Sequence, residues 1–409
     1  MISVDTMLIL LGLIIYTGFG GTLLFEKTKI PDLLLLIFIG IVIGFIFDIS
    51  SADGKLTSIA PYFGSLALII ILFEGGLHLD IQMVLKQLKA TLILVITVFL
   101  LSMFGIAIIY YLATDYGIYQ GLLLGSILGC TSGAIVIPVV QQLNISKDMK
   151  TLLVLEASVV DAFAVVFTMT LLTLSSESHV QITHIGKALF DGVTNAILIS
   201  MAAGFLWLKV MTKMQGKPLI YMLTFAAMVL IYAGVEYIDG SGAIAVLIFG
   251  MILSNGNMII SIYHKKKGIK NYSQLISGLE TTEIKGIHQE ISFFTRTFFF
   301  VFLGLIISFN NLTLWVIFFS IGILFVLIAT RFASVLFLSS GKNPMTFINK
   351  ITIWSMMPRG LASVVLSVSV LDKNIEGTEN FAEITFLIVM LTNILMTAFV
   401  IYFERKKTN

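Results

Sequence analysis

The chain has 409 residues, of which 58% are hydrophobic and 12% are charged, and its formal net charge is +2. Soluble domains carry about 25% charged residues, so this composition excludes an ordinary soluble protein and a disordered one. The single cysteine, Cys130, excludes a disulfide framework, and the five histidines show no metal-binding spacing. We therefore expect an all-helical integral membrane protein with no cofactor and no nucleic-acid partner.

Long apolar segments recur along the chain, and about 20 apolar residues suffice for a helix to cross a bilayer. The segments are continuously apolar and do not alternate, so each is expected to be a helix and not a barrel strand. The N-terminus lacks the basic region of a signal peptide, so the first segment is expected to be retained. The sequence predicts thirteen spans, at about residues 6–25, 31–47, 60–77, 90–113, 119–142, 150–174, 187–211, 218–236, 241–257, 291–309, 312–339, 346–371 and 381–403.

The positive charges divide unequally between the two sides of these spans. Nineteen of the 25 lysines and arginines lie in connections on one side, three on the other and three inside spans. Cytoplasmic loops are enriched in Lys and Arg, so this pattern predicts an N-terminus outside the cell, a C-terminus in the cytoplasm and a place in the cell membrane. Residues 258–290 form the one sizeable connection and are expected to lie as a helix at the cytoplasmic surface.

Two of the predicted spans are interrupted by small residues and proline. The fifth contains GSILGCTSGAIVIP, and the twelfth contains SMMPRGLASVV. These spans are seven apart, and an odd shift reverses direction, so spans 1–6 and 8–13 are expected to be inverted repeats with two broken, crossing helices. One interruption alone commonly reflects helix packing, whereas a matched pair points to the central site of a transporter.

Six charged side chains lie inside the predicted spans. A charge at a helix centre costs about 2.5–3.5 kcal/mol on insertion scales, so these groups are expected to face the protein interior or water. We expect Arg331 to pair with Glu156, and Arg359 to neutralise carbonyl ends at the break of the twelfth span. The acids are Glu74, Glu156 and Asp161, and the arginines are Arg296, Arg331 and Arg359.

The sixth span, LLVLEASVVDAFAVVF, carries two of these acids. Five positions place Glu156 and Asp161 about 140° apart around a helix, so they are expected to have different roles. Ser158 shares the face of Asp161, and a carboxylate with a hydroxyl and freed carbonyls is a hard-oxygen site suited to a small cation. Burial favours the neutral form of a carboxyl group, so Asp161 can bind a proton when the cation leaves. Glu74, near the cytoplasmic end of the third span, is either a second ligand or a charge at the interface.

Four stretches carry a resemblance to a known family: FEGGLHLD, the Glu-x-x-x-x-Asp stretch of the sixth span, RTFFFVFLGL and MPRGLASVVL. In this order they resemble the monovalent cation:proton antiporter superfamily, in its prokaryotic sodium/proton antiporter branch related to the sodium/proton exchangers. The resemblance covers essentially the whole chain. It implies a homodimer in which a core of spans 4–6 (90–174) and 11–13 (312–403) moves like an elevator against a dimerisation scaffold of spans 1–3 (1–77) and 7–10 (187–309).

The resemblance also implies roles for single residues. Asp161 matches the ion-binding aspartate, Glu74 a glutamate that helps to line the site, and Thr131 a threonine in the unwound part of the fifth span. Glu156 and Arg331 match a buried pair that holds the core together.

The sequence departs from the family pattern beside the site. Val160 stands where the family often has asparagine, and Ser132 stands where it often has aspartate. With one carboxylate fewer, one-for-one, electroneutral exchange is favoured.

Several functions are compatible with these residues. Exchange of sodium or lithium for protons is the leading hypothesis. Potassium/proton exchange is the close alternative, because Thr131–Ser132 followed by Ala-Ile-Val also resembles the Kef-type branch. Proton-coupled uptake of another solute would require more hydrogen-bonding side chains, and an intramembrane aspartyl protease would require a Gly-x-Gly-Asp motif that the chain lacks. A channel or sensor built on a transporter fold is a third possibility, and transport against a gradient separates it from an exchanger.

Overall fold

A computed structural model describes residues 4–28, 32–47, 55–174, 182–214, 219–259, 281–306, 312–339, 345–371, 373 and 375–408. The regular structure within these ranges is helical, without strands. The helices are α1 (Val4–Thr28), α2 (Asp32–Ile46), α3 (Lys55–Leu77), α4 (Ile81–Ala113), α5 (Ile118–Leu128), α6 (Gly133–Gln142), α7 (Lys147–Leu174), α8 (Ile182–Lys213), α9 (Ile220–Tyr237), α10 (Gly242–Ser254), α13 (Thr281–Ile306), α14 (Leu314–Ser339), α15 (Phe347–Ser355), α16 (Leu361–Leu371) and α17 (Phe381–Thr408).

The helices coincide with the apolar segments of the sequence. Within the described ranges, seven helical segments are long and apolar enough to cross a membrane, and five further apolar helices are shorter. The count of thirteen crossings stays a prediction. The surface helix expected at 258–290 falls largely outside the described residues, and α13 begins at Thr281.

Short polar side chains fix several helix starts. Asp80 precedes α4, and its carboxylate accepts hydrogen bonds from the amides of Gln82 and Met83 at 2.8 and 3.1 Å. Ser241 and Thr346 cap α10 and α15 in the same way. These caps satisfy amide groups that the first helical turn leaves without carbonyl partners, so they define where each helix begins.

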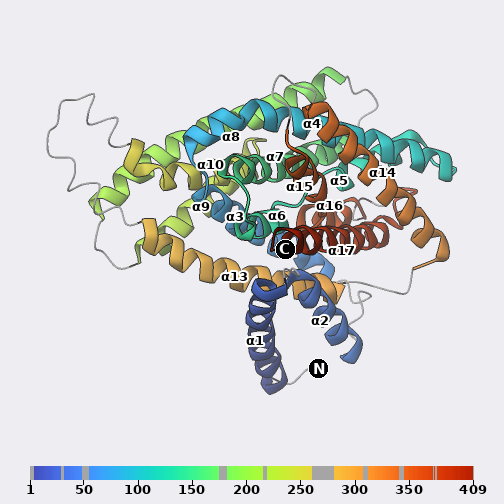
Figure 1. The fold of residues 1–409 in the computed structure, drawn as a ribbon, viewed down its shortest axis with the longest axis horizontal. Helices are drawn as coiled ribbons and strands as arrows, with labels where there is room; N and C mark the ends of the chain where they lie inside the picture. The colour runs from blue at the N-terminus through green and yellow to red at the C-terminus, as the bar shows by residue number, and fades with distance from the viewer. Residues whose placement is uncertain are drawn as a thin grey trace.

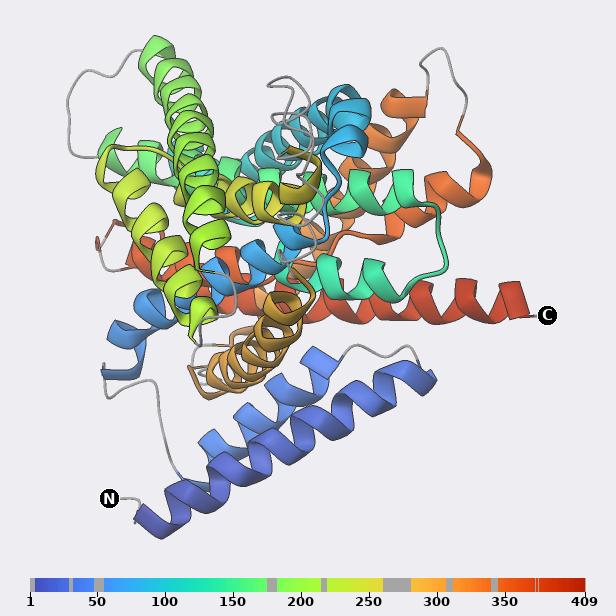
Figure 2. The ribbon, with the colours of Figure 1, turned by 90° about the vertical axis from the view of Figure 1, so that its left-hand side faces the viewer.

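The helices form a bundle with one pair set apart. In Figures 1 and 2, α1 and α2 lie side by side below the rest, and α13 lies between this pair and the remaining helices. α6, α3, α16 and α17 lie near the centre of Figure 1. The short helices on either side of each non-helical stretch are therefore surrounded by longer ones.

Two large apolar clusters share α7. One joins α4, α5, α14, α16 and α17 to residues of α7 that include Val160 and Ala164. The other joins α1–α4, α6, α10 and α13 to the first half of α7, including Leu153 and Ala157, and also reaches α14, α15 and α17. α7, which carries Glu156 and Asp161, is therefore packed on several sides and holds both acids in the interior.

Glycines allow α3 and α10 to pack with their backbones in contact. A Cβ atom at Gly76 would overlap the carbonyl oxygen of Leu247, and one at Gly250 would lie 2.7 Å from the carbonyl oxygen of Phe73. Small residues let helices in a membrane approach closely and gain dispersion contacts. This crossing fixes the position of Glu74, which lies two residues before Gly76 on α3.

We predict that Gly76→Ala destabilises the protein by about 1–3 kcal/mol, because the added methyl group forces backbone or side chains apart. Gly322→Ala is the matched control, since Gly322 lies within α14 and a Cβ there would have nothing within 4 Å. Alanine is a better helix former than glycine, so the control is expected to be neutral or stabilising by up to about 1 kcal/mol. Thermal unfolding of the purified variants measures both, and an equal melting temperature for the two would contradict this account of the crossing.

Candidate functional site

The chain leaves the helical conformation between α5 and α6 and again between α15 and α16, and these two stretches touch. The backbone amide of Ser132 donates a hydrogen bond to the carbonyl of Pro358 at 2.8 Å. Gly360 makes this contact possible, because a Cβ there would lie 2.5 Å from the Ser132 hydroxyl oxygen. Pro358 has no amide hydrogen to donate, which disfavours a continuous helix through this stretch. The contact joins parts of the chain more than 200 residues apart.

Arg359 neutralises the carbonyl end of α5. Its side chain is 1% exposed, and Nε donates to the carbonyl of Leu128, the last residue of α5, at 2.7 Å. Nη1 donates to the carbonyl of Met357 at 3.1 Å and to the hydroxyl of Thr131 at 3.5 Å. A helix C-terminus carries partial negative charge and unpaired carbonyls, so a cation there is stabilised even without a carboxylate partner.

Residues of α17 hold the backbone of Arg359. The Thr392 hydroxyl accepts a hydrogen bond from the Arg359 amide at 3.0 Å, and the Asn393 side-chain amide donates to the Arg359 carbonyl at 2.9 Å. Sequence reasoning missed both residues. The available signal was an adjacent Thr-Asn pair in the middle of an otherwise apolar segment, FLIVMLTNILM.

Asp161 lies against the start of α6 and is 2% exposed. Its Oδ2 accepts a hydrogen bond from the amide of Gly133, the first residue of α6, at 3.0 Å. The amides of a helix N-terminus carry partial positive charge and favour a carboxylate. Asp161 Oδ1 and the hydroxyl of neighbouring Ser132 are buried and have no hydrogen-bond partner among the described residues. Neither of these buried oxygen atoms is therefore fixed by a hydrogen bond from a described residue.

Glu156 and Arg331 form a buried ion pair between α7 and α14. Arg331 donates to both carboxylate oxygens, at 2.7 and 3.0 Å, and the side chains are 0% and 1% exposed. Arg331 also donates to the carbonyls of Ile353 at 3.1 Å and Met356 at 2.6 Å, at the end of α15. The two charges of the pair therefore balance each other, and Arg331 also binds carbonyl groups at the end of α15. Arg331 makes no hydrogen bond to Asp161.

Glu74 lies apart from Asp161. Within the described residues its carboxylate accepts a hydrogen bond from the hydroxyl of Ser292 on α13 and shares none with Asp161. One turn before Ser292, His288 is buried, with one ring nitrogen 2.7 Å from the Tyr221 hydroxyl and the other 2.8 Å from the Ile70 carbonyl oxygen. This network fixes α13 against α3, and the scattered positions of its members in the sequence gave no signal for it.

Two further expected site residues are engaged differently. The Ser158 hydroxyl donates to the Val154 carbonyl one turn earlier in α7 at 2.8 Å, so only its lone pairs are available to a cation. Arg296 lies on α13, away from the interrupted segments, and makes no ion pair with any described residue. The structure therefore brings Asp161, Thr131, Ser132 and Arg359 together at the interruptions and places Glu74 on α3 and Arg296 on α13.

We predict that Glu156→Ala lowers the free energy of unfolding by about 3–5 kcal/mol, because it leaves the buried Arg331 without a counter-charge. Lys86→Gln is the control, since Lys86 and Asp148 also lie 2.7 Å apart but are 61% and 40% exposed. An exposed pair contributes about 0–1 kcal/mol. Thermal or denaturant unfolding compares the two, and similar losses from both variants would contradict the structural role of the buried pair.

Comparison with known proteins places the fold and the family. The family model described as "Sodium/hydrogen exchanger, transmembrane" matches residues 11–402. The sodium proton antiporter MjNhaP1 from Methanocaldococcus jannaschii, in its structure at pH 8, superimposes with a TM-score of 0.75 at 22% identity, covering 95% of each chain. At this identity the superposition shows a shared fold.

Two curated relatives are named for antiport. Na(+)/H(+) antiporter 1 of Methanocaldococcus jannaschii is 25% identical over 74% of this chain and 68% of its own length. The K(+)/H(+) antiporter NhaP of Alkalimonas amylolytica is 25% identical over 67% of this chain, which spans about half (48%) of that relative. These relatives are transporters and not enzymes. The family model covers nearly the whole chain, and the protein therefore belongs to the transmembrane sodium/hydrogen exchanger family as a multi-pass membrane protein.

Proposed function

We propose that this protein exchanges sodium or lithium ions for protons across the cell membrane, and that cation and proton compete for Asp161. The observation that carries the proposal is the environment of this carboxylate. One oxygen accepts a hydrogen bond at the α6 N-terminus, while the other, like the Ser132 hydroxyl, is buried with no hydrogen-bond partner among the described residues. A buried group without a fixed partner gains from binding either a cation or a proton.

The proposed transport cycle requires a moving core. We infer that α4–α7 and α14–α17, corresponding to predicted spans 4–6 and 11–13, move as one body against the remaining helices. The cluster formed only by helices of this set supports the grouping. The proposal includes thirteen crossings, inverted repeats with interrupted fifth and twelfth spans, a homodimer, an N-terminus outside and a C-terminus in the cytoplasm. The distribution of Lys and Arg supports the orientation.

Potassium is the second candidate cation. It is favoured by the relative named as a K(+)/H(+) antiporter. The ligand set does not separate the two ions, because carboxylate and hydroxyl oxygens suit hard cations generally. The same assay that tests exchange also ranks sodium, lithium and potassium.

We predict that Asp161→Asn abolishes cation-evoked proton movement, because the amide cannot take up and release a proton. Purified protein in liposomes with an internal pH dye receives an imposed pH difference, followed by sodium, lithium or potassium. Wild type is expected to dissipate the gradient with its preferred ion. Asp148→Asn is the control, since Asp148 is an exposed aspartate near the start of the same helix. Equal responses from wild type and Asp161→Asn would contradict the proposal.

We further predict that Ser132→Ala raises the apparent KM for the cation about tenfold. The variant removes a hydroxyl oxygen that would contact the cation, and a polar contact with a charged group contributes about 1.5–3 kcal/mol. Stability should change little, because the Ser132 hydroxyl has no hydrogen-bond partner among the described residues. Ser126→Ala is the matched control. Its hydroxyl lies within α5, before the interruption begins, and is hydrogen-bonded at 2.8 Å to that of Thr168, so its loss should lower the melting temperature and leave KM unchanged. An unchanged KM in Ser132→Ala would remove this residue from the site.

A further inference from the structure

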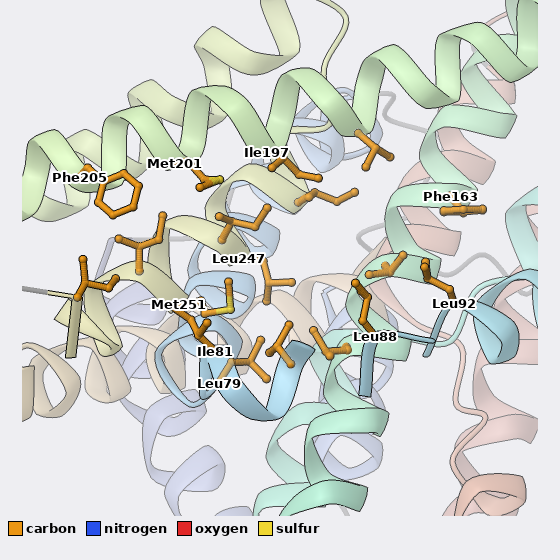
Figure 3. A pocket seen from close by; sticks show the side chains of 18 of the residues that line it. Leu79, Ile81, Leu88, Leu92, Phe163, Ile197, Met201, Phe205, Leu247 and Met251 are labelled. Carbon is orange, nitrogen blue, oxygen red and sulfur yellow. The ribbon is translucent and has the colours of Figure 1, made fainter. Parts of the chain in front are cut away.

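An apolar cavity of about 830 Å³ separates two groups of helices. α4 and α7 form one wall, and α8 and α10 form the other. Figure 3 shows leucine, isoleucine, phenylalanine and methionine side chains pointing into the space from these helices. The volume falls within the range of about 300–1,000 Å³ that is typical of ligand pockets.

Every residue that lines the cavity is apolar, which defines the chemistry of its occupant. A water molecule needs two to four polar partners to be held in a cavity, and none of the lining side chains offers one. A cation or a polar solute would be still less stable there. The occupant must therefore be a hydrocarbon chain or an equivalent apolar group.

The cavity opens where hydrocarbon is available. Leu88 and Leu92 on α4 and Met201 and Phe205 on α8 line it and are 40–45% exposed. In a multi-pass membrane protein these exposed apolar faces meet lipid tails. Leu155 and Leu247, on the inner walls, are only 5% and 4% exposed. A tail that enters between α4 and α8 therefore reaches a closed inner end.

A positive charge follows the cavity on α8. Phe190, Ile197, Met201 and Phe205 lie on one face of this helix, and Lys209 continues that face one turn later. Lys209 is exposed and makes no ion pair with a described residue. Lys89 on α4 is also exposed, but it lies between Leu88 and Leu92, which Figure 3 shows at the other end of the cavity from Phe205.

We propose that this cavity binds one acyl chain of an anionic phospholipid, whose phosphate headgroup is held by Lys209. The acyl chain gains no transfer free energy by leaving one hydrocarbon environment for another, so retention depends on packing and on the headgroup charge. The nearby carboxylate, Asp80, does not oppose this, because it is bound to the amides that begin α4. The proposal requires a membrane protein and does not depend on which cation is transported.

The test uses photoactivatable lipids with the whole purified protein in phosphatidylcholine nanodiscs. Two probes carry the same diazirine-labelled acyl chain, one on phosphatidylglycerol and one on phosphatidylcholine, and peptide mass spectrometry locates the labels. In wild type the anionic probe is expected to label the peptides containing Leu155 and Leu247 about fivefold more than the neutral probe, because one lysine near the surface attracts an anionic headgroup by about 1 kcal/mol.

The variants separate headgroup from tail. Lys209→Gln should abolish the preference for the anionic probe. Lys89→Gln is the matched control, since Lys89 is an exposed lysine whose neighbours Leu88 and Leu92 lie at the other end of the cavity, and it should keep the preference. Ile248→Trp, which fills the cavity, should reduce labelling by both probes at an unchanged melting temperature.

Two results would overturn the proposal. Equal labelling by both probes in wild type would mean that bulk lipid enters without a headgroup site. No labelling at Leu155 or Leu247 in wild type would mean that tails do not enter. Neither readout uses transport, so a failed exchange assay leaves this test intact.

Discussion

The structure depends on satisfying backbone groups where two helices stop inside an apolar bundle. Interrupting a helix there leaves amides and carbonyls without water to bind, at a cost of several kcal/mol for each unsatisfied group. The Ser132–Pro358 hydrogen bond satisfies an amide of one stretch and a carbonyl of the other. Arg359 takes the carbonyl end of α5, and Arg331 takes that of α15. Each arginine is buried because it replaces the helical partners that the interruption removes.

This arrangement also explains why α7 carries two acids with different surroundings. Glu156 faces Arg331 and is held by two charge-assisted hydrogen bonds, while Asp161, about 140° away around the helix, faces the N-terminus of α6. A carboxylate locked by an arginine cannot readily exchange its partner, because releasing it leaves two buried charges. Asp161 accepts a hydrogen bond from the Gly133 amide through Oδ2, and its Oδ1 has no hydrogen-bond partner among the described residues. Glu156 and the acid that we propose to exchange, Asp161, are therefore distinguished by their partners and not by their depth.

The sequence indicated the class of fold because composition and continuous apolar segments leave few alternatives in a membrane. It also indicated the partners of the buried arginines, since so few charges lie within the spans that each has few possible counter-groups. Thr392, Asn393 and Ser292 were not predicted, because neutral polar residues are common in membrane helices and carry no mark of their partner. The sequence also did not predict which face of most helices packs against the others. A helix that is apolar all round has no periodicity from which its neighbours can be inferred. Glu74 and Arg296 are examples. Counting the charges inside the spans groups both with the site, whereas the structure places them on α3 and α13.

Charge balance around Asp161 constrains the proposed exchange further. Glu156 and Arg331 cancel one another, and Arg359 is permanently positive at the interrupted segments. In the exchange that we propose, Asp161 is the one acid that changes its partner, so a bound monovalent cation and a bound proton give the site the same net charge. A moving element that carries equal charge in both directions does no net work against the membrane potential, which is worth about 2.3 kcal/mol per charge per 100 mV. The serine at position 132, in place of a second acid, therefore favours a cycle driven by ion and proton concentrations and not by voltage.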